Sequence, residues 1–254
     1  MRRWGKLDWN RQKFTKIYYK LQAKIVPGLK HSQSIYEDVL NEHCEKPLKW
    51  LDLGCGHHLL PPWRLEQEKR LIDKAGMVVG IDYDHLSLTK HKTIKNRLRG
   101  DISHLPFPDS TFDLITSNMV FEHLEHPEKQ LKEIYRVLSS GGKLIFHTPN
   151  RLGYTVLMAR VVPDAIKGKI IYFLEGRKEE DVFPTFYRIN SFAEINSLAK
   201  LSGFNVLKIK RVCSSAVFGI LTPIVLFELF YIRFLLSETG KSFRTNLIVV
   251  LEKA

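Results

Sequence analysis

The spacing of apolar positions changes near residue 48, from a helical period to short apolar runs separated by helical stretches. Before this point, Phe14, Ile17, Tyr18, Leu21 and Ile25 recur at helical spacing, with lysines between them. This pattern predicts an amphipathic helix in a basic N-terminal region that covers residues 1–47. Two interpretations stay open: a helix packed on the domain with its lysines in solvent, or a helix lying on a membrane or over a substrate cleft.

From residue 48 to residue 149 the pattern predicts strands that alternate with helices, as in βαβ units. The predicted strands are Leu48–Leu53, Met77–Ile81, a short strand ending near Asp101, Phe112–Ser117 and Lys143–His147. The predicted helices are Trp63–Ala75, His85–Thr93 and Pro127–Leu138, and a turn is predicted at Ser140–Gly142. Such alternation favours a parallel sheet with helices on both faces.

Beyond Pro149 the alternation of strands and helices becomes less regular. Residues 150–189 are predicted to form a helical insertion, followed by the helix Ser191–Leu201 and the strands Phe204–Val212 and Phe243–Leu251. The fold class is therefore α/β, with a doubly wound, mostly parallel, seven-stranded sheet. One domain is expected over residues 48–254, with insertions at about 150–189 and 214–240.

The stretch Ala216–Leu236 is unusually apolar, since fourteen of its 21 residues are Val, Leu, Ile or Phe. These side chains favour membrane insertion by roughly 6 kcal/mol, while Arg233 and Glu228 oppose it by roughly 5 kcal/mol. Pro223 adds a further penalty, so no transmembrane helix is predicted. A buried helical hairpin, a hydrophobic lid and a membrane-docking surface remain as alternatives.

The composition of the chain indicates its cellular compartment and the charge of its partners. The chain of 254 residues has three separated cysteines and a formal net charge of +12. An odd number of cysteines and a charged N-terminus without an apolar segment lead us to expect a cytoplasmic protein. The positive charge favours an anionic partner, and residues 10–26 and 216–236 are the candidates for peripheral membrane contact.

The main chemical signal is Asp52, Gly54, Cys55 and Gly56, which close the first predicted strand. Glycines there let the backbone turn tightly and come close to a ligand. A dinucleotide fingerprint needs a third glycine at position 59, which is Leu, and this argues against nicotinamide or flavin binding.

Two further carboxylates follow at positions that suit a nucleoside. Asp82 ends the second predicted strand, where a carboxylate accepts hydrogen bonds from both hydroxyls of a ribose. Asp101 could accept from the exocyclic amine of an adenine ring, with Ile102 packed against that ring. Asn118 ends the fourth strand.

The order of these motifs resembles that of the class I S-adenosylmethionine (SAM)-dependent methyltransferases, particularly the branch related to ubiquinone and menaquinone methyltransferases. The matching stretches are LDLGCG, VVGIDYD, and the long run from GDISHLPFPDSTFDL to KLIFHTPN. The resemblance covers residues 48–150 well and 190–212 loosely. It implies a Rossmann-like fold and SAM as the cofactor.

Carried over to this sequence, the resemblance places the glycine loop (Asp52, Gly54, Cys55, Gly56) against the methionine part of SAM. It places Asp82 at the ribose, and Tyr83, Asp101 and Ile102 at the adenine. Asn118 and Met119 would line the cleft near the sulfonium. The family's third glycine is replaced by His58, so His57 or His58 could contact the methionine carboxylate, and Pro61 with Pro62 implies a stiffer first loop.

His123 is the best candidate for a general base, because it follows the fourth strand and histidine suits proton transfer near neutral pH. A structural histidine that caps the next helix is the alternative, and His147 is the second choice. Some related enzymes bind a metal ion through a Glu-x-x-Glu-His run. Here Glu122 and His123 match, but Met119 replaces the first glutamate, so no metal is predicted.

The acceptor is constrained mainly by exclusion. The run Asn118–Phe121 lacks the two prolines typical of base-amine methyltransferases, and no Pro-Cys nucleophile is present, which disfavours nucleic acid. We expect methyl transfer to a small-molecule acceptor that is hydrophobic or linked to a lipid, at an oxygen atom. An RNA methyltransferase and a SAM-binding protein without turnover are the alternatives.

Overall fold

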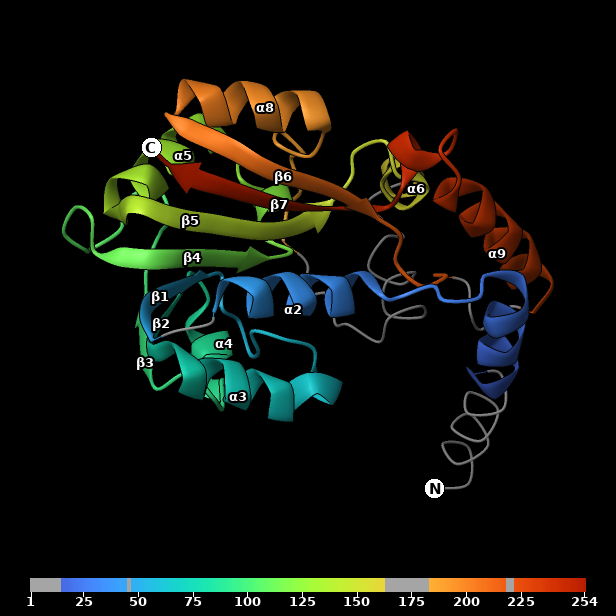
Figure 1. Ribbon diagram of the computed structural model, residues 1–254, viewed down its shortest axis with the longest axis horizontal. Helices are drawn as coiled ribbons and strands as arrows, with labels where there is room; N and C mark the ends of the chain where they lie inside the picture. The colour runs from blue at the N-terminus through green and yellow to red at the C-terminus, as the bar shows by residue number, and fades with distance from the viewer. Residues whose placement is uncertain (1–14, 45–46, 163–182, 218–221) are drawn as a thin grey trace. The chain divides into compact units, whose positions relative to one another are not determined.

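A computed structural model describes residues 15–44, 47–162, 183–217 and 222–254 (Figure 1). The chain divides into two compact units. The sheet unit comprises Gln33–Arg151, Pro184–Lys210 and Asn246–Ala254, and the helical unit comprises Met1–Ser32, Leu152–Phe183 and Arg211–Thr245. The sheet unit thus begins upstream of residue 48, where the alternation of strands and helices begins in the sequence.

A seven-stranded sheet forms the centre of the fold, with the order β3-β2-β1-β4-β5-β7-β6. The strands are β1 (Leu48–Leu53), β2 (Gly76–Asp82), β3 (Asn96–Arg99), β4 (Phe112–Asn118), β5 (Leu138–Pro149), β6 (Phe204–Val212) and β7 (Asn246–Lys253). The pairs among β1 to β5 are parallel, and β7 runs antiparallel to β5. The predicted doubly wound, mostly parallel sheet is confirmed.

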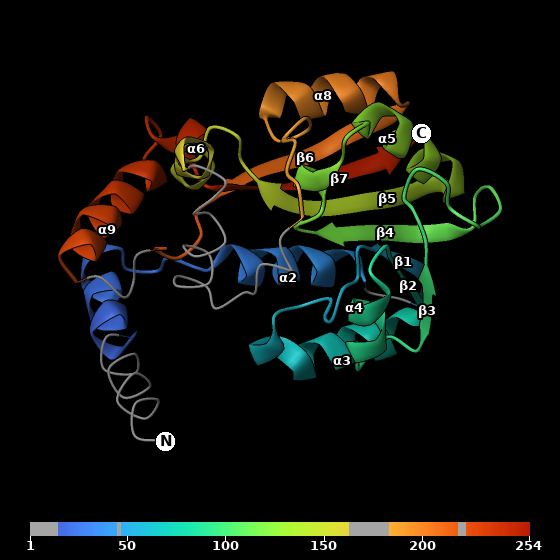
Figure 2. The ribbon, with the colours of Figure 1, turned by 180° about the vertical axis from the view of Figure 1, so that it is seen from behind.

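The helices of the sheet unit cover both faces of this sheet. They are α2 (Ser32–His43), α3 (Leu65–Ala75), α4 (His85–Lys90), α5 (Pro127–Val137) and α8 (Phe192–Leu201), with short 3-10 turns η1 (Pro62–Arg64) and η2 (Phe121–His123). Figures 1 and 2 show α2 on one face and α5 with α8 on the other.

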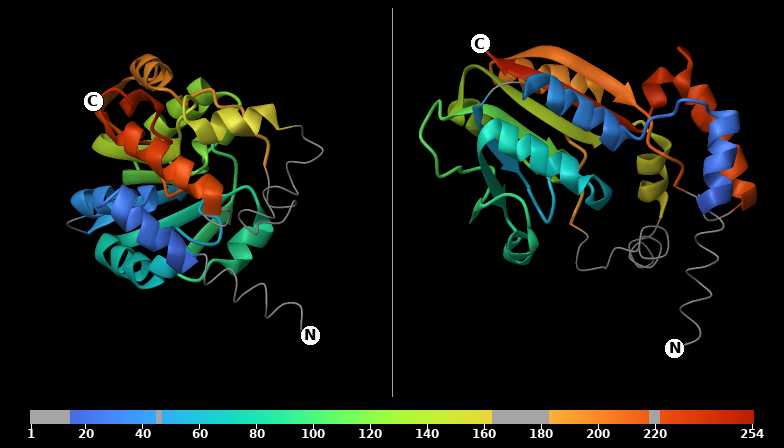
Figure 3. Two further views of the ribbon diagram at one scale, coloured as in Figure 1. Left: turned by 90° about the vertical axis from the view of Figure 1, so that its right-hand side faces the viewer. Right: turned by 60° about the horizontal axis from the view of Figure 1, so that its bottom comes forward.

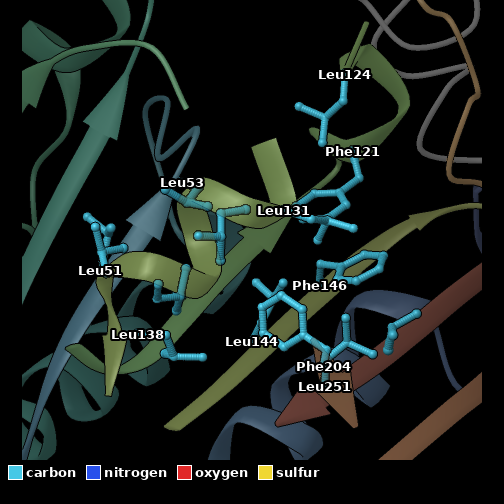
Figure 4. Packing of buried hydrophobic residues seen from close by; sticks show 14 of the residues in the cluster. Leu51, Leu53, Phe121, Leu124, Leu131, Leu138, Leu144, Phe146, Phe204 and Leu251 are labelled. Atoms are coloured by element: carbon cyan, nitrogen blue, oxygen red, sulfur yellow. The ribbon is translucent and has the colours of Figure 1, made fainter. Parts of the chain in front are cut away.

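Alternation along the central strands supplies both faces with buried side chains. Leu51 and Leu53 of β1 join the cluster beneath α5 and α8, whereas Trp50 and Asp52 face the opposite way and are also buried. Figure 4 shows the first cluster, in which the rings of Phe121 and Phe146 stack with their centroids 4.0 Å apart. A strand buried on both faces reads as a nearly continuous apolar run, which is why these strands could be predicted.

The helical unit contains a helix over residues 15–25, α6 (Tyr154–Val161), α9 (Thr222–Leu236) and the turn η4 (Lys241–Phe243). Tyr18 and Ile25 of the first helix pack with Val225, Leu229 and Ile232 of α9 in one apolar cluster. Figure 3 shows these two helices side by side. The first interpretation of the N-terminal pattern, a packed helix with lysines in solvent, therefore holds for residues 15–25.

Several element predictions need correction. The turn expected at residues 140–142 lies inside β5, where the pairing with β4 shifts register, because Gly141 adopts a φ of +70° without ending the strand. The last strand begins at Asn246 rather than at Phe243, which belongs to η4. The helix α2 was not separated from the basic N-terminal region, although Tyr36, Val39 and Leu40 give it a buried face.

The insertion and the apolar stretch are only partly described. Within the predicted insertion the structure gives α6, and residues 163–182 lie outside the described residues. Within Ala216–Leu236 it gives one helix, α9, and residues 218–221 lie outside the described residues, as does Phe14. In the described part of the chain, no helix has the length and apolar character needed to cross a membrane.

Candidate functional site

The loop after β1 is held in a conformation that only glycine adopts easily. Gly54 and Gly56 have φ values of +67° and +49°. A Cβ on Gly54 would lie 2.4 Å from Cγ2 of Val120, so the Val120 side chain, in the loop after β4, packs directly against the Gly54 backbone. The backbone N–H groups of Gly54 and Cys55 donate to the carbonyl oxygen of Ile81, which ties this loop to β2.

The Asp82 carboxylate lies at the end of β2, facing the glycine loop. Its Oδ2 accepts a hydrogen bond from the backbone N–H of Gly56 at 2.8 Å, and its Oδ1 accepts from that of Asp84 at 2.8 Å. Each oxygen of an ionised carboxylate has a second lone pair, so these two bonds leave acceptor capacity for a ligand. The two motifs, 26 residues apart, are thus brought together.

The loops after β2 and β3 meet at the same edge. The backbone N–H of Gly100 donates to the carbonyl oxygen of Asp82 at 3.0 Å, and this places Asp101 beside the second motif. Oδ1 of Asp101 accepts from the N–H of Ser103, while Ile102 is half-buried against the apolar cluster. Tyr83 is exposed, with the Arg99 guanidinium 5.4 Å from its ring centre.

At the end of β4, Asn118 takes part in a network of side chains. Its Nδ2 donates to Oε1 of Gln33 at 2.9 Å and its Oδ1 accepts from Nε2 of Gln33 at 3.2 Å. The Nδ1 of His147 lies 2.9 Å from the same Oδ1, and the His147 ring stacks on Tyr36. Met119 follows with a φ of +59° and is partly exposed.

Two residues of the glycine motif point into the protein instead. Oδ1 of Asp52 accepts from the Thr116 hydroxyl at 2.5 Å, and that hydroxyl accepts from Nε1 of Trp50. Burial, together with the nearby carboxylates of Glu68 and Asp82, raises the Asp52 pKa to about 8. Cys55 is buried against Gly80, and burial raises the pKa of its thiol. The structure gives both side chains a place in the packing that supports the loop.

His123 lies on η2 and is half-buried, with its Nδ1 2.6 Å from the carbonyl oxygen of Pro184. Its neighbour Glu122 is buried and accepts from the hydroxyl of Thr148 at 3.1 Å. His147, the second candidate base, is 1% exposed. Of the two histidines, His123 is therefore the more accessible.

Two histidines of the first loop, His57 and His58, lie near a third, His91, which follows α4. The rings of His57 and His58 lie 6.4 Å apart, and His58 lies 6.5 Å from His91, whose pKa burial lowers to about 4. The loop is anchored by the N–H of Leu60, which donates to Oε2 of the buried Glu68. Among the described residues, no three His, Cys, Asp or Glu side chains are grouped as a metal ion would need.

Sequence reasoning missed Gln33 and Thr116. Gln33 is 85 residues from its partner Asn118, and no local sequence pattern predicts that the two side chains pair. Thr116 could have been found, because alternation along two parallel strands in register puts it beside Asp52.

The strand order defines a Rossmann-like α/β domain, and the carboxyl ends of β1, β2 and β4 form the edge at which open parallel sheets generally bind ligands. Comparison with known proteins narrows the class. Residues 51–146 match the family model described as a methyltransferase domain.

Two curated relatives illustrate the range of similar proteins. A demethylmenaquinone methyltransferase of Lactiplantibacillus plantarum is 36% identical over 104 residues, covering 37% of this chain and 42% of the relative. A malonyl-[acyl-carrier protein] O-methyltransferase of Yersinia pestis is 36% identical over 102 residues, covering 39% and 35% of the two chains. The chain thus spans less than half the length of these relatives.

Solved structures share the whole fold at low identity. A SAM-dependent methyltransferase from Mesorhizobium loti superimposes with a TM-score of 0.52 at 18% identity, over 85% of this chain and 96% of that chain. The [4+2]-cyclase SpnF gives 0.55 at 17% identity, over 87% and 80%. A cyclase with this fold shows that the fold alone does not define the reaction.

Residues 51–146 thus carry a methyltransferase domain, similar to those of methyltransferases whose cofactor is SAM, and the fold is that of solved SAM-dependent methyltransferases. The residues present fit that cofactor. A Cβ added at Gly56 would meet only the Gly54 carbonyl oxygen at 3.9 Å and Asp82 Oδ2 at 4.0 Å, so the loop is open to close approach there, and the Asp82 carboxylate beside it keeps acceptor capacity.

Proposed function

We propose that this chain transfers a methyl group from SAM to a small-molecule acceptor that is hydrophobic or lipid-linked, at an oxygen atom. The observation that supports it most is the 2.8 Å hydrogen bond from Gly56 to Asp82, which joins the glycine loop to the ribose-binding carboxylate. SAM supplies an activated methyl group on a sulfonium. The protein has to bind and orient the two reactants and accept a proton.

In this proposal Gly54 and Gly56 lie along the methionine part, and Asp82 accepts from the ribose hydroxyls. Tyr83, Asp101 and Ile102 form the adenine site, while Asn118 and Met119 line the reacting end. Asp52 and Cys55 act through packing, because both side chains are buried.

His123 is proposed as the group that takes the acceptor's proton. A carbonyl oxygen can only accept a hydrogen bond, so the contact with Pro184 requires the proton to reside on Nδ1. The neutral ring then has its basic lone pair on Nε2. We expect His123→Gln to lower kcat at least a hundredfold with little change in affinity for S-adenosylhomocysteine.

The nature of the acceptor is supported by the relatives and by the apolar segments. The similar proteins named above are a demethylmenaquinone methyltransferase and an O-methyltransferase of a carrier-linked malonyl group. Ala216–Leu236 and residues 10–26 are the segments through which we propose contact with a membrane that holds such an acceptor.

The cofactor site is tested by thermal unfolding with S-adenosylhomocysteine at about a hundred times its dissociation constant, which should add roughly 2.7 kcal/mol. For a domain of this size we expect the melting temperature to rise by about 5 °C or more. Asp82→Ala should abolish the rise, while Asp73→Ala, an exposed aspartate on α3, should retain it. A rise of equal size in Asp82→Ala would overturn the site.

Turnover is tested separately with methyl-labelled SAM, lipid extracts and total RNA. Label recovered in an alkali-labile ester or in an aryl ether would support transfer to oxygen. Label recovered only in RNA, or ligand binding without transfer to any extract, would overturn the proposed acceptor class.

A further inference from the structure

The helix α9 is apolar on both of its faces, and the described residues of the helical unit bury only one of them. Val225, Leu229, Ile232 and Leu235 are buried against the helix of residues 15–25 and its neighbours. The outer face of α9, defined here as Ile224, Phe227, Phe230, Tyr231 and Phe234, is exposed, and Phe227 is 79% exposed. A helix that is apolar all round is normally covered on every side.

The helix α6 extends this apolar surface. Leu157, Met158 and Val161 are exposed on it, Val161 by 83%. A hollow of about 230 Å³ joins the two helices and is lined by Tyr154 of α6 and by Ile224, Phe227, Glu228 and Tyr231 of α9. The hollow therefore brings Tyr154 of α6 to the outer face of α9, and it is about large enough for part of an aliphatic chain.

The carboxylate in this hollow is turned inward. Oε1 of Glu228 accepts from the Tyr154 hydroxyl and from the N–H of Val217, both at 2.6 Å, and the residue is 6% exposed. The outer face of α9 thus presents aromatic rings without an acidic group, which is the composition that suits the boundary between lipid headgroups and chains.

The net charge of the helical unit favours an anionic surface over a second copy of the chain. Its described residues contain nine Lys or Arg and two Glu, a net formal charge of +7. Lys16, Lys20 and Lys24 lie on the side of the helix of residues 15–25 that faces away from α9, since its apolar side packs on α9, so they act through the net charge of the unit and do not border the outer face. Two copies of so positive a unit repel each other, whereas each basic group near an anionic bilayer raises binding by about fivefold.

The length of α9 determines how it would meet a bilayer. Fifteen residues extend about 22 Å, which is less than the hydrocarbon thickness of about 30 Å. Arg233 in its last turn also disfavours burial in the hydrocarbon.

We infer that the outer face of α9 docks the protein in the plane of an anionic phospholipid bilayer, with Phe227 and Phe230 inserted below the headgroups and one lipid chain in the hollow beside Tyr154. The helix of residues 15–25 contributes charge and supports α9 from within, and it does not insert its own apolar side. This inference deepens the proposed function and rests on it for its purpose, the delivery of a membrane-resident acceptor.

The experiment is flotation of the full chain with vesicles of equimolar phosphatidylglycerol and phosphatidylcholine, compared with vesicles of phosphatidylcholine alone. The test variant carries Phe227→Asp with Phe230→Asp. Its matched control carries Phe192→Asp with Leu201→Asp, two exposed apolar residues on α8 in the sheet unit. A second pair, Lys20→Glu with Lys24→Glu, tests the charge.

We expect the unaltered chain to bind the anionic vesicles at least tenfold better than the neutral ones. Raising the salt from about 0.1 M to about 1 M, which shortens the Debye length from about 10 to 3 Å, should remove most of this preference. The α9 variant should lose at least tenfold in binding, the lysine variant severalfold, and the α8 control less than twofold.

The inference is overturned if the unaltered chain binds neither vesicle, or if the α9 variant binds as well as the α8 control. A dimer that dissociates on Phe227→Asp with Phe230→Asp would instead assign the outer face to a second copy. The α9 variant must keep its melting temperature, and Phe227→Ser with Phe230→Ser replaces it if it does not. Vesicle binding needs no SAM, so its failure leaves the proposed methyl transfer intact, and a failed methyl transfer leaves the docking result intact.

Discussion

The two units use the same kinds of side chain in opposite ways. In the sheet unit, Phe121 and Phe146 are fully buried between the sheet and α5, and both faces of the central strands are covered. In the helical unit, α9 buries one face and leaves Phe227 and Phe230 exposed. Apolar residues in the first unit therefore stabilise the fold, while those on the outer face of α9 are available for contact with another surface.

The difference between the two units is tested most directly by truncating one phenylalanine in each of them. Phe146→Ala should lower the free energy of unfolding by about 4 kcal/mol, because it empties a closed site and removes the stacking on Phe121. Phe227→Ala should change it by less than about 0.5 kcal/mol. Denaturant unfolding of both variants measures the difference, and equal losses would mean that the outer face of α9 is covered in solution.

A second test replaces one glycine of positive φ in each unit. Gly54→Ala should cost at least about 2 kcal/mol, because the strained φ of +67° is combined with a clash against Val120. Gly28→Ala, at a φ of +78° with nothing near its Cβ, should cost about 1 kcal/mol. If Val120→Ala recovers none of the Gly54→Ala loss in unfolding measurements, the close approach of the two loops is wrong.

The elements that were predicted correctly are those whose sequence pattern lies within a few consecutive residues. The strands β1 and β6 were predicted with their observed bounds, because apolar runs bounded by polar or turn residues define a strand without reference to other parts of the chain. The glycine loop and Asp82 were found because each follows a strand end. The parallel topology predicts that the glycine loop and Asp82 lie close together. It does not predict which backbone N–H donates to which carboxylate oxygen.

The missed features depend on distant partners. Asp52 was grouped with the glycine loop, although its neighbours Leu51 and Leu53 face α5 and α8, and alternation therefore turns Asp52 to the other face. The role of α9 depends on which of its faces the helix of residues 15–25 covers, and two apolar faces look the same in a sequence. The roles assigned to all of the cofactor-site residues and to His123 remain predictions.

A pH measurement tests the buried side of the glycine motif. Because the pKa of Asp52 is raised to about 8 in the folded chain, from a value near 4 when unfolded, the native state holds its proton more tightly. This contribution is complete below about pH 4 and is lost as the pH rises toward 8, with a slope of at most about 1.4 kcal/mol per pH unit. Asp52→Asn should remove that slope. The unfolding free energy of the unaltered chain should therefore fall relative to that of Asp52→Asn as the pH rises from 5 to 8, and parallel curves would contradict the burial of an Asp52 carboxyl.

The smallest expected effect lies where the sheet unit begins, at Gln33. Its amide and that of Asn118 exchange two hydrogen bonds, so Gln33→Ala removes both and should cost about 1 kcal/mol of stability. Asn41→Ala is the control, since the amide of this residue on the same helix donates to the carbonyl oxygen of Glu37 one turn earlier. If Asn118 lines the reacting end as proposed, Gln33→Ala should also lower the affinity for S-adenosylhomocysteine severalfold, because Asn118 loses the partner that fixes its orientation. A loss of stability with unchanged ligand affinity would assign Gln33 to the packing of α2 alone, and would separate that helix from the ligand site in spite of its contact with Asn118.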